Sequence, residues 1–329
     1  MQRFTLVEQF LKDQANTPGA TGEFSRILTR LSLAGRMIAL EIMRAGFVGK
    51  LGLTGQVNVQ QEEVRALDVI SNEIFIRVFE TMDLVTSVAS EEMDKEFYYA
   101  DSRKGGYVVL FDPLDGSSNV DVNGSMGSIF SIHRRKKGTE RGSLDDFLQK
   151  GSDQVAAGYI LYGPSTIFVY TAGGPVHGFT LDRAIGEFFL THSNIQIPGG
   201  KGSYAVNEAN EPKWDAKTQE LVTRFRHGQT RCGARSARYV GALVADFHRT
   251  MIQGGIYMYP GEVKKKDGKL RLLYEASPLA MVARQAGGRA TDGRQDILAI
   301  QPKELHQRTP LFIGAKADVD EVTEYLTPR

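Results

Sequence analysis

Cysteine is almost absent from this sequence of 329 residues, in which Cys232 is the only one. A single cysteine excludes an intrachain disulfide, a CxxC redox pair and a zinc site built from several thiolates. Hydrophobic runs are also short, and none approaches the roughly 18 consecutive apolar residues of a membrane-spanning helix. The N-terminus lacks the apolar core of a signal peptide and carries Glu8 and Asp13, which a transit peptide would avoid. We therefore expect a cytoplasmic protein that contacts no membrane.

An excess of charge of either sign is absent as well. Lys and Arg together number 40 and Asp and Glu 39, so the net charge is +1 and offers no broad basic surface to a nucleic-acid backbone. Nucleic acid is therefore not an expected partner. The composition, with 41% hydrophobic and 24% charged residues, is typical of a folded globular protein and not of a disordered chain.

Alternating helix and strand patterns are what the sequence does contain. Apolar residues recur at helical spacing over residues 24–45 and 62–82, which predicts two helices, with Asp68 inside the second. Short apolar runs bounded by Gly and Pro predict strands, and they span residues 84–89, 107–111, 128–133, 155–161, 166–171, 176–181 and 255–259. Later helices are expected from about residue 215 and over residues 239–251 and 274–285. The alternation predicts an α/β layered fold. A Gly- and Pro-rich stretch at 193–202 suggests two domains, residues 1–195 and 196–329.

Two of the predicted strands run directly into acidic residues. Ser90-Glu91-Glu92 follows the first, and Asp112-Pro113-Leu114-Asp115-Gly116-Ser117-Ser118-Asn119 follows the second. Pro113 is expected to force a turn that lets Asp112 and Asp115 face one side, and Asp68 is expected to approach them from the preceding helix. A plain surface turn would explain Asp-Pro-Leu-Asp-Gly on its own, because all its polar residues are turn formers. Carboxylates converging from three segments instead favour a magnesium site.

These acidic segments resemble those of class 1 fructose-1,6-bisphosphatases. The resemblance continues through Ala237–Gly241, Val244–Thr250, Tyr259-Pro260 and Gly268–Glu275, so it covers nearly the whole chain. The Asp-Pro-Leu-Asp-Gly-Ser core alone would indicate only the wider lithium-sensitive phosphatase superfamily, which includes inositol monophosphatases. The resemblance implies a layered α-β-α-β-α sandwich, a homotetramer, and hydrolysis of the 1-phosphate of fructose 1,6-bisphosphate in gluconeogenesis or Calvin-type carbohydrate metabolism.

The same resemblance implies roles for individual residues. It assigns two or three Mg²⁺ ions, which Mn²⁺ can replace, to Glu91, Asp112, the Leu114 carbonyl, Asp115 and Glu275, with Glu62 as a further candidate. Asp68 and Glu92 would position and deprotonate the attacking water. The residues expected to bind substrate are Asp115, Gly116, Ser117, Ser118, Asn207, Arg238, Tyr239, Tyr259, Lys269 and Arg271. Among these, Arg238 would reach in from a neighbouring subunit.

An inhibitory AMP site is also implied, and it includes Thr21, Gly22, Glu23, Phe24, Ser25, Tyr107 and Arg134. The chain departs from the family pattern at Gly106, where the family has a lysine. It departs again at Asn210, where a phosphate-binding tyrosine is expected. The alternatives are a sedoheptulose-1,7-bisphosphatase, an inositol-monophosphatase-like enzyme, and a catalytically silent regulator that binds metal and nucleotide. The complete set of acidic residues argues against the silent regulator.

Overall fold

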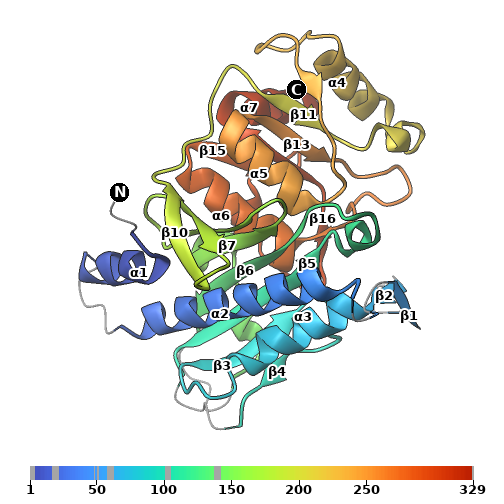
Figure 1. Ribbon diagram of the computed structural model, residues 1–329. Helices are drawn as coiled ribbons and strands as arrows, with labels where there is room; N and C mark the ends of the chain where they lie inside the picture. The colour runs from blue at the N-terminus through green and yellow to red at the C-terminus, as the bar shows by residue number, and fades with distance from the viewer. Residues whose placement is uncertain are drawn as a thin grey trace.

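The computed structural model describes residues 4–16, 22–47, 49, 52–57, 63–100, 105–136 and 142–327. Two residues proposed above for a site, Thr21 and Glu62, lie outside the described residues. The described chain forms two sheets with helices on their outer faces and between them (Figure 1).

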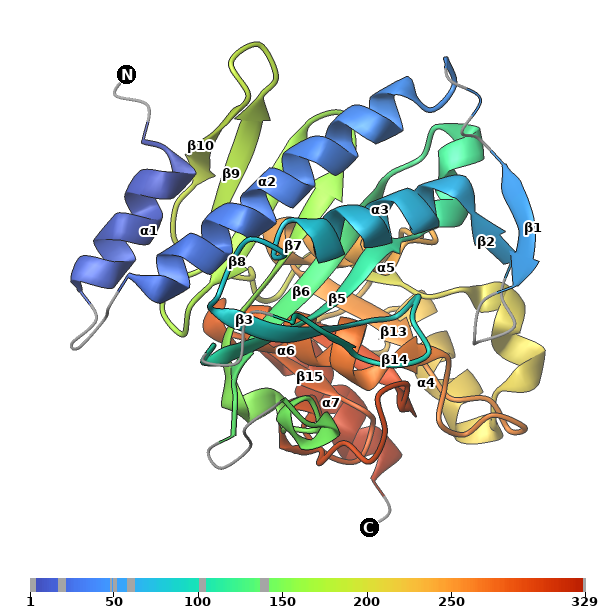
Figure 2. The ribbon, with the colours of Figure 1, turned by 90° about the horizontal axis from the view of Figure 1, so that it is seen from below.

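The first sheet has the strand order β10-β9-β8-β7-β6-β5-β3-β4 among the described residues. Its strands are β3 (Val85–Ser90), β4 (Phe97–Tyr98), β5 (Tyr107–Asp115), β6 (Met126–Arg134), β7 (Gln154–Tyr162), β8 (Thr166–Thr171), β9 (His177–Asp182) and β10 (Glu187–His192). Helices α2 (Glu23–Arg44) and α3 (Ala66–Arg77) lie across one face (Figure 2). Their buried side chains, such as Leu31 and Phe75, pack against Phe111 and Phe130 of the sheet. Helix α1 (Leu6–Ala15) lies at the β10 edge.

The second sheet has the order β12-β11-β13-β17-β15. Its strands are β11 (Ser203–Ala205), β12 (Ser236–Ala237), β13 (Gly255–Tyr259), β15 (Gly288–Thr291) and β17 (Leu311–Ala315). Helices α5 (Leu243–Gln253) and α6 (Ser277–Gln285) are sandwiched between the sheets, where Phe247 and Leu279 share a core with Tyr159 and Ile313. Helices α4 (Ala216–Arg226) and α7 (Lys316–Leu326) cover the outer face. The predicted α-β-α-β-α sandwich is therefore confirmed.

Short elements complete the fold. Strands β1 (Leu53–Val57) and β2 (Glu63–Arg65) pair antiparallel, and β14 (Leu270–Arg271) pairs with β16 (Arg308–Thr309). Short 3-10 helices span Ser117–Val122, Leu144–Asp146, Gly151–Asp153, Glu208–Lys213 and Ile297–Ala299, and a π-helical turn spans Leu272–Ala276. The chain leaves the first sheet after His192 and enters the second at Ser203. The domain boundary after residue 195 stays a prediction. Within the described ranges, no helix has both the length and the apolar character needed to cross a membrane.

The helix predicted over residues 62–82 was wrong at both ends. Arg65 is extended, with φ −94° and ψ 154°, and the helix runs only from Ala66 to Arg77. The Asp68 carboxylate accepts a hydrogen bond of 2.9 Å from the Arg65 backbone N–H. Asp68 therefore lies in the first helical turn, where free N–H groups favour a carboxylate, and not in the helix interior.

The turn predicted at Pro113 was also wrong. Strand β5 continues to Asp115 and bulges, because three steps from Asp112 to Asp115 face two steps from Ile129 to Gly127 on β6. Further along, the helix predicted over residues 239–251 begins only at Leu243, after Gly241 at φ +87°. The helix predicted over 274–285 begins within the π-helical turn, and regular α-helix follows from Ser277.

Candidate active site

The acidic segments converge on a cavity of about 460 Å³. It is lined by Arg65, Glu91, Glu92, Asp112, Leu114, Asp115, Gly116, Ser117, Ser118, Tyr239, Gly241, Leu243, Tyr257, Tyr259, Lys269, Leu270, Arg271 and Glu275. The first half of the chain supplies Arg65 and most of the acids, whereas the second half supplies the tyrosines, Lys269, Arg271 and Glu275. The cavity thus joins the two sheets.

Three buried carboxylates form the centre of this cavity. Oxygens of Glu91, Asp112 and Glu275 all lie within 4.8 Å of one another. Strands β3 and β5 run parallel, with Ser90 opposite Phe111, so the next residues along the two strands, Glu91 and Asp112, lie side by side. The Arg271 backbone N–H donates to Glu275 over 2.5 Å and orients it from the other side.

Burial, followed by repulsion from Glu91, raises the pKa of Asp112 and of Glu275 well above the usual range of a carboxyl group. Such a set of crowded oxygen donors is costly without a cation and matches the preference of a hard divalent metal ion. These residues therefore fit the metal site that was predicted from the sequence.

Asp115 lies beside this trio because of the bulge in β5. Its carboxylate accepts a hydrogen bond of 2.7 Å from the Val244 N–H in the first turn of α5. Burial raises the pKa of Asp115 to about 7, and the Glu91 carboxylate adds to the increase. The bulge thus places two acids of one strand at the same cavity.

Ser117 and Ser118 begin the 3-10 helix that follows Gly116. Gly116 has φ +75°, and a Cβ added there would lie 2.4 Å from the Cβ of Ala242. Glycine is required both by the backbone conformation and by this close approach. Ser117 hydrogen-bonds to the Asp68 carboxylate, and burial raises the pKa of Asp68 to about 6.

Two predicted substrate contacts lie elsewhere in this chain. Arg238 does not line the acidic cavity but a separate one of about 410 Å³, together with Lys201, Ser236 and Gln253. The Asn207 side chain accepts a hydrogen bond from the Ala209 N–H and begins a 3-10 helix, and it is not among the residues lining the acidic cavity.

Sequence reasoning missed Arg65, Tyr257 and Leu270 as residues of the cavity. Arg65 forms an ion pair with Asp121. A signal for Tyr257 existed, because it precedes Tyr259 by two positions in β13 and so points to the same face of the sheet. Arg65 had no comparable signal, since it was placed inside a predicted helix.

The described residues among those assigned to an AMP site gather at the N-terminal end of α2. Gly22 has φ +84° and precedes the first helical residue, Glu23. The Phe24 ring lies 6.2 Å from the Tyr107 ring, and the Arg134 guanidinium lies 5.3 Å from that same ring. Ser25 donates to the side chain of Gln14 on α1 over 3.0 Å.

Comparison with known proteins agrees with this geometry. Residues 4–193 match the family described as "Fructose-1-6-bisphosphatase, N-terminal domain", and residues 197–327 match "Fructose-1-6-bisphosphatase, C-terminal domain". Among curated relatives, the class 1 fructose-1,6-bisphosphatase of Trichormus variabilis is 48% identical over 324 residues, which are 98% of this chain and 92% of the relative.

Solved structures give the same result. The holo form of Leishmania major fructose-1,6-bisphosphatase superposes with a TM-score of 0.92 at 39% identity, over 99% of both chains. The same enzyme in its T-state superposes with a TM-score of 0.88 at 39% identity, over 100% of both chains. From its motifs, its five layers and these likenesses, the chain belongs to the fructose-1,6-bisphosphatase family.

Proposed function

We propose that this chain hydrolyses the 1-phosphate of fructose 1,6-bisphosphate, giving fructose 6-phosphate and phosphate. The observation that carries the proposal is the buried trio Glu91, Asp112 and Glu275 at a cavity that also contains Lys269 and Arg271. Acids for a metal and cations for an anionic substrate thus share one enclosure. Family membership narrows the substrate to a sugar bisphosphate.

The metal is proposed to be Mg²⁺, with Mn²⁺ as a substitute and two or three ions per subunit. Glu91, Asp112, Asp115, Glu275 and the Leu114 carbonyl would hold the ions. When bound, such ions neutralise phosphoryl oxygens, lower the pKa of a bound water and stabilise a leaving alkoxide. Oxygen donors alone suit these hard cations.

Asp68 and Glu92 are proposed to position the attacking water and accept its proton. Asp68 is suited to accept a proton near neutral pH, because its pKa is raised to about 6. Its hydrogen bond with Ser117 connects it to the loop proposed to contact the scissile phosphate. Gly116, Ser117 and Ser118 would contact that phosphate.

The rest of the substrate is assigned to the second half of the chain. Tyr239, Tyr259 and Lys269 are proposed to hold the 6-phosphate, and Arg271, which lines the same cavity, is proposed to act on the side of the sugar and the metals. Arg238 is exposed and outside the cavity, which is consistent with a residue that enters a neighbouring subunit's site in a homotetramer. Asn207 is also proposed to contact the 6-phosphate.

AMP is proposed as an inhibitor that binds where Gly22–Ser25, Tyr107 and Arg134 meet. The solved T-state of the Leishmania major enzyme supports a regulated family. A cytoplasmic location completes the proposal.

The test is phosphate release from fructose 1,6-bisphosphate, sedoheptulose 1,7-bisphosphate and inositol 1-phosphate, each with Mg²⁺ and with EDTA. We expect the fructose substrate to give the highest kcat/KM and EDTA to abolish the rate. A higher kcat/KM on either other substrate would replace the proposed reaction by that one. Binding of metal without hydrolysis of any substrate would favour the silent regulator.

A further inference from the structure

Residues 303–309 connect the C-terminal half to the proposed metal site by backbone pairing. Within this segment β16 pairs antiparallel with β14, placing Arg308 opposite Arg271 and Thr309 opposite Leu270. The Gln307 carbonyl accepts a hydrogen bond of 2.7 Å from the Leu272 N–H, at the start of the π-helical turn that carries Glu275. The segment is therefore fixed to one group of proposed metal ligands.

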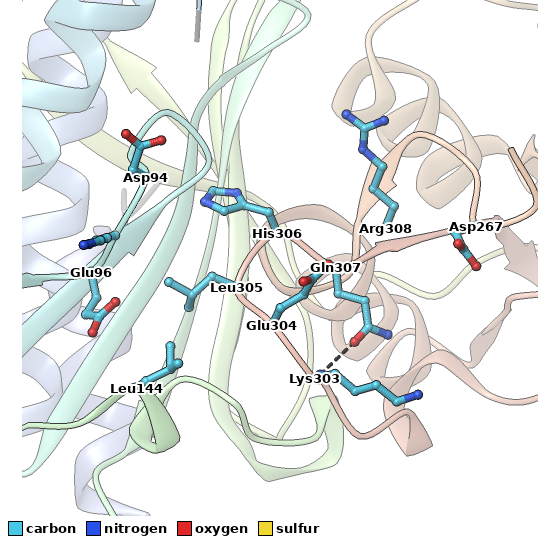
Figure 3. A pocket seen from close by; sticks show the side chains of 11 residues that line it. Asp94, Glu96, Leu144, Asp267, Lys303, Glu304, Leu305, His306, Gln307 and Arg308 are labelled. Atoms are coloured by element: carbon cyan, nitrogen blue, oxygen red, sulfur yellow. Dashed lines mark hydrogen bonds between the residues drawn. The ribbon is translucent and has the colours of Figure 1, made fainter. Parts of the chain in front are cut away.

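His306 extends from this segment toward the other group. Its Nε2 lies 2.9 Å from the Met93 carbonyl oxygen, and a carbonyl only accepts, so Nε2 carries the proton and donates. Figure 3 shows the His306 side chain directed from the 303–308 segment toward the loop of Asp94 and Glu96, beside a cavity of about 1080 Å³.

Met93 ends the short turn that carries Glu91 and Glu92. Its N–H donates to the Ser90 carbonyl over 3.3 Å, and the Glu92 N–H donates to the Ser90 hydroxyl over 3.2 Å. The hydrogen bond from His306 to the Met93 carbonyl thus holds the end of this turn.

The His306 ring also packs against the C-terminal acid segment. Its centroid lies 5.4 Å from the ring of Tyr274, which is fully buried and directly precedes Glu275. One imidazole therefore contacts the turn of Glu91 and Glu92 and the turn of Glu275. These two turns are separated by more than half of the sequence.

We propose that His306 is a positioning residue, which through its hydrogen bond to Met93 holds the Glu91–Glu92 turn in place against the turn of Glu275. Loss of the bond frees the turn and weakens metal binding. This inference rests on the proposed function, because it takes Glu91 and Glu275 as ligands of the same metal centre. Residues that orient metal ligands typically alter metal affinity by about 10- to 100-fold when they are removed.

A matched control lies on a neighbouring residue of the same region. The Gln301 side chain donates to the Leu148 carbonyl over 2.9 Å, so it also joins the C-terminal half to the first half, but away from the acidic turns. Gln301→Ala removes one such bond and leaves the metal-ligand turns untouched. This variant measures how much the loss of any one hydrogen bond between the two halves changes stability and metal binding.

The experiment measures Mn²⁺ binding by electron paramagnetic resonance without substrate, together with thermal unfolding and the kcat and KM for fructose 1,6-bisphosphate. His306→Leu is expected to weaken Mn²⁺ binding at least about tenfold, whereas Gln301→Ala changes it less than twofold. His306→Gln places a donor near the position of Nε2 and should restore most of the affinity. The loss should appear in kcat and in the metal requirement more than in KM.

Equal metal affinity in His306→Leu and Gln301→Ala would overturn the proposal, as would failure of His306→Gln to restore binding. If the leucine variant does not fold, His306→Gln is compared with His306→Asn, whose shorter side chain does not reach Met93. Only the asparagine variant should then lose affinity, and equal affinity of the two would also overturn the proposal. A wild-type protein that binds Mn²⁺ but hydrolyses no sugar bisphosphate would instead contradict the proposed function.

Discussion

The guanidinium of Arg271 lies 2.9 Å from a carboxylate oxygen of Glu91, and the two side chains are only 4% and 10% exposed. Arg271 comes from the second half of the chain and Glu91 from the end of β3 in the first sheet. The backbone N–H of the same arginine orients Glu275. A single buried cation thus stands against the carboxylates that are proposed to hold the metals, and it joins the two halves at that point.

Replacing this arginine should destabilise the metal-free protein. Arg271→Leu leaves Glu91 buried without its partner, which we expect to lower the free energy of unfolding by about 3 kcal/mol. Urea unfolding in EDTA measures this change. Arg77→Leu is the control, because the pair of Arg77 with Glu73 is solvent-exposed and should contribute less than about 1 kcal/mol. Equal losses in the two variants would contradict a special role for the buried pair.

The crowded acids predict an unusual pH dependence of stability. The pKa of Asp115 is raised to about 7 by burial first, and burial also raises those of Asp112 and Glu275 well above the usual range of a carboxyl group. The folded state then holds protons that the unfolded state has already lost, so stability falls as the pH rises through these values. In EDTA, the melting temperature should be lower at pH 8 than at pH 6.

Mg²⁺ should remove much of this difference, because it replaces the protons as the compensating charge. Asp115→Asn should also reduce the dependence on pH in EDTA, since it removes one of the titrating groups. Scanning calorimetry at both pH values checks both statements. A metal-free protein that melts higher at pH 8 would show that other groups dominate.

Asp68 should set the acidic limb of the rate. Its pKa of about 6 means that the ionised form, which accepts a proton, is lost as the pH falls through that value. Asp68→Asn can still accept the hydrogen bond from Arg65 but cannot serve as a base, so we expect kcat to fall by about 100-fold or more. Mn²⁺ binding should change little. A variant that retains an acidic limb near pH 6 would assign that limb to another group.

Long periodic patterns predicted the frame of this fold, whereas the site depended on local irregularities that patterns do not encode. Helix α2 and strands β5 to β9 follow their apolar spacing, since burial against a sheet enforces it. Pro113 suggested a turn. In the structure, β5 instead stays paired with β6, and Pro113 lies in the bulge between Asp112 and Asp115. Arg65 was not predicted as a residue of the cavity, because the helical pattern that follows it was extended to include it. The convergence of Glu91 and Asp112 was predictable, because both follow apolar runs that form neighbouring strands of one sheet.

The AMP proposal can be tested by restoring a cation at Gly106. A side chain there meets no heavy atom within 4 Å at its Cβ and needs no left-handed backbone, so Gly106→Lys should fold normally. We expect AMP to inhibit the variant at a concentration at least about tenfold lower, because a lysine can pair with the phosphate. Gly199→Lys adds the same charge at another open position and serves as control. Equal AMP sensitivity in both variants would contradict an AMP site at this end of α2.

The acidic loop should tolerate no side chain at Gly116. Gly116→Ala places a Cβ 2.4 Å from that of Ala242, in a backbone with φ +75°. Gly200→Ala has nearly the same strain, with φ +73°, but no neighbouring heavy atom within 4 Å, so it isolates the cost of the backbone alone. We expect that backbone strain to cost about 1 kcal/mol in each variant, and the clash to add a similar amount only at position 116.

Because the clash displaces Ser117 and Ser118, activity should fall in Gly116→Ala even at temperatures where it remains folded. Denaturant unfolding of both variants, followed by kcat measurements on the folded fractions, separates strain from displacement. Similar stability in the two variants with full activity at position 116 would mean that the loop adapts to a larger residue.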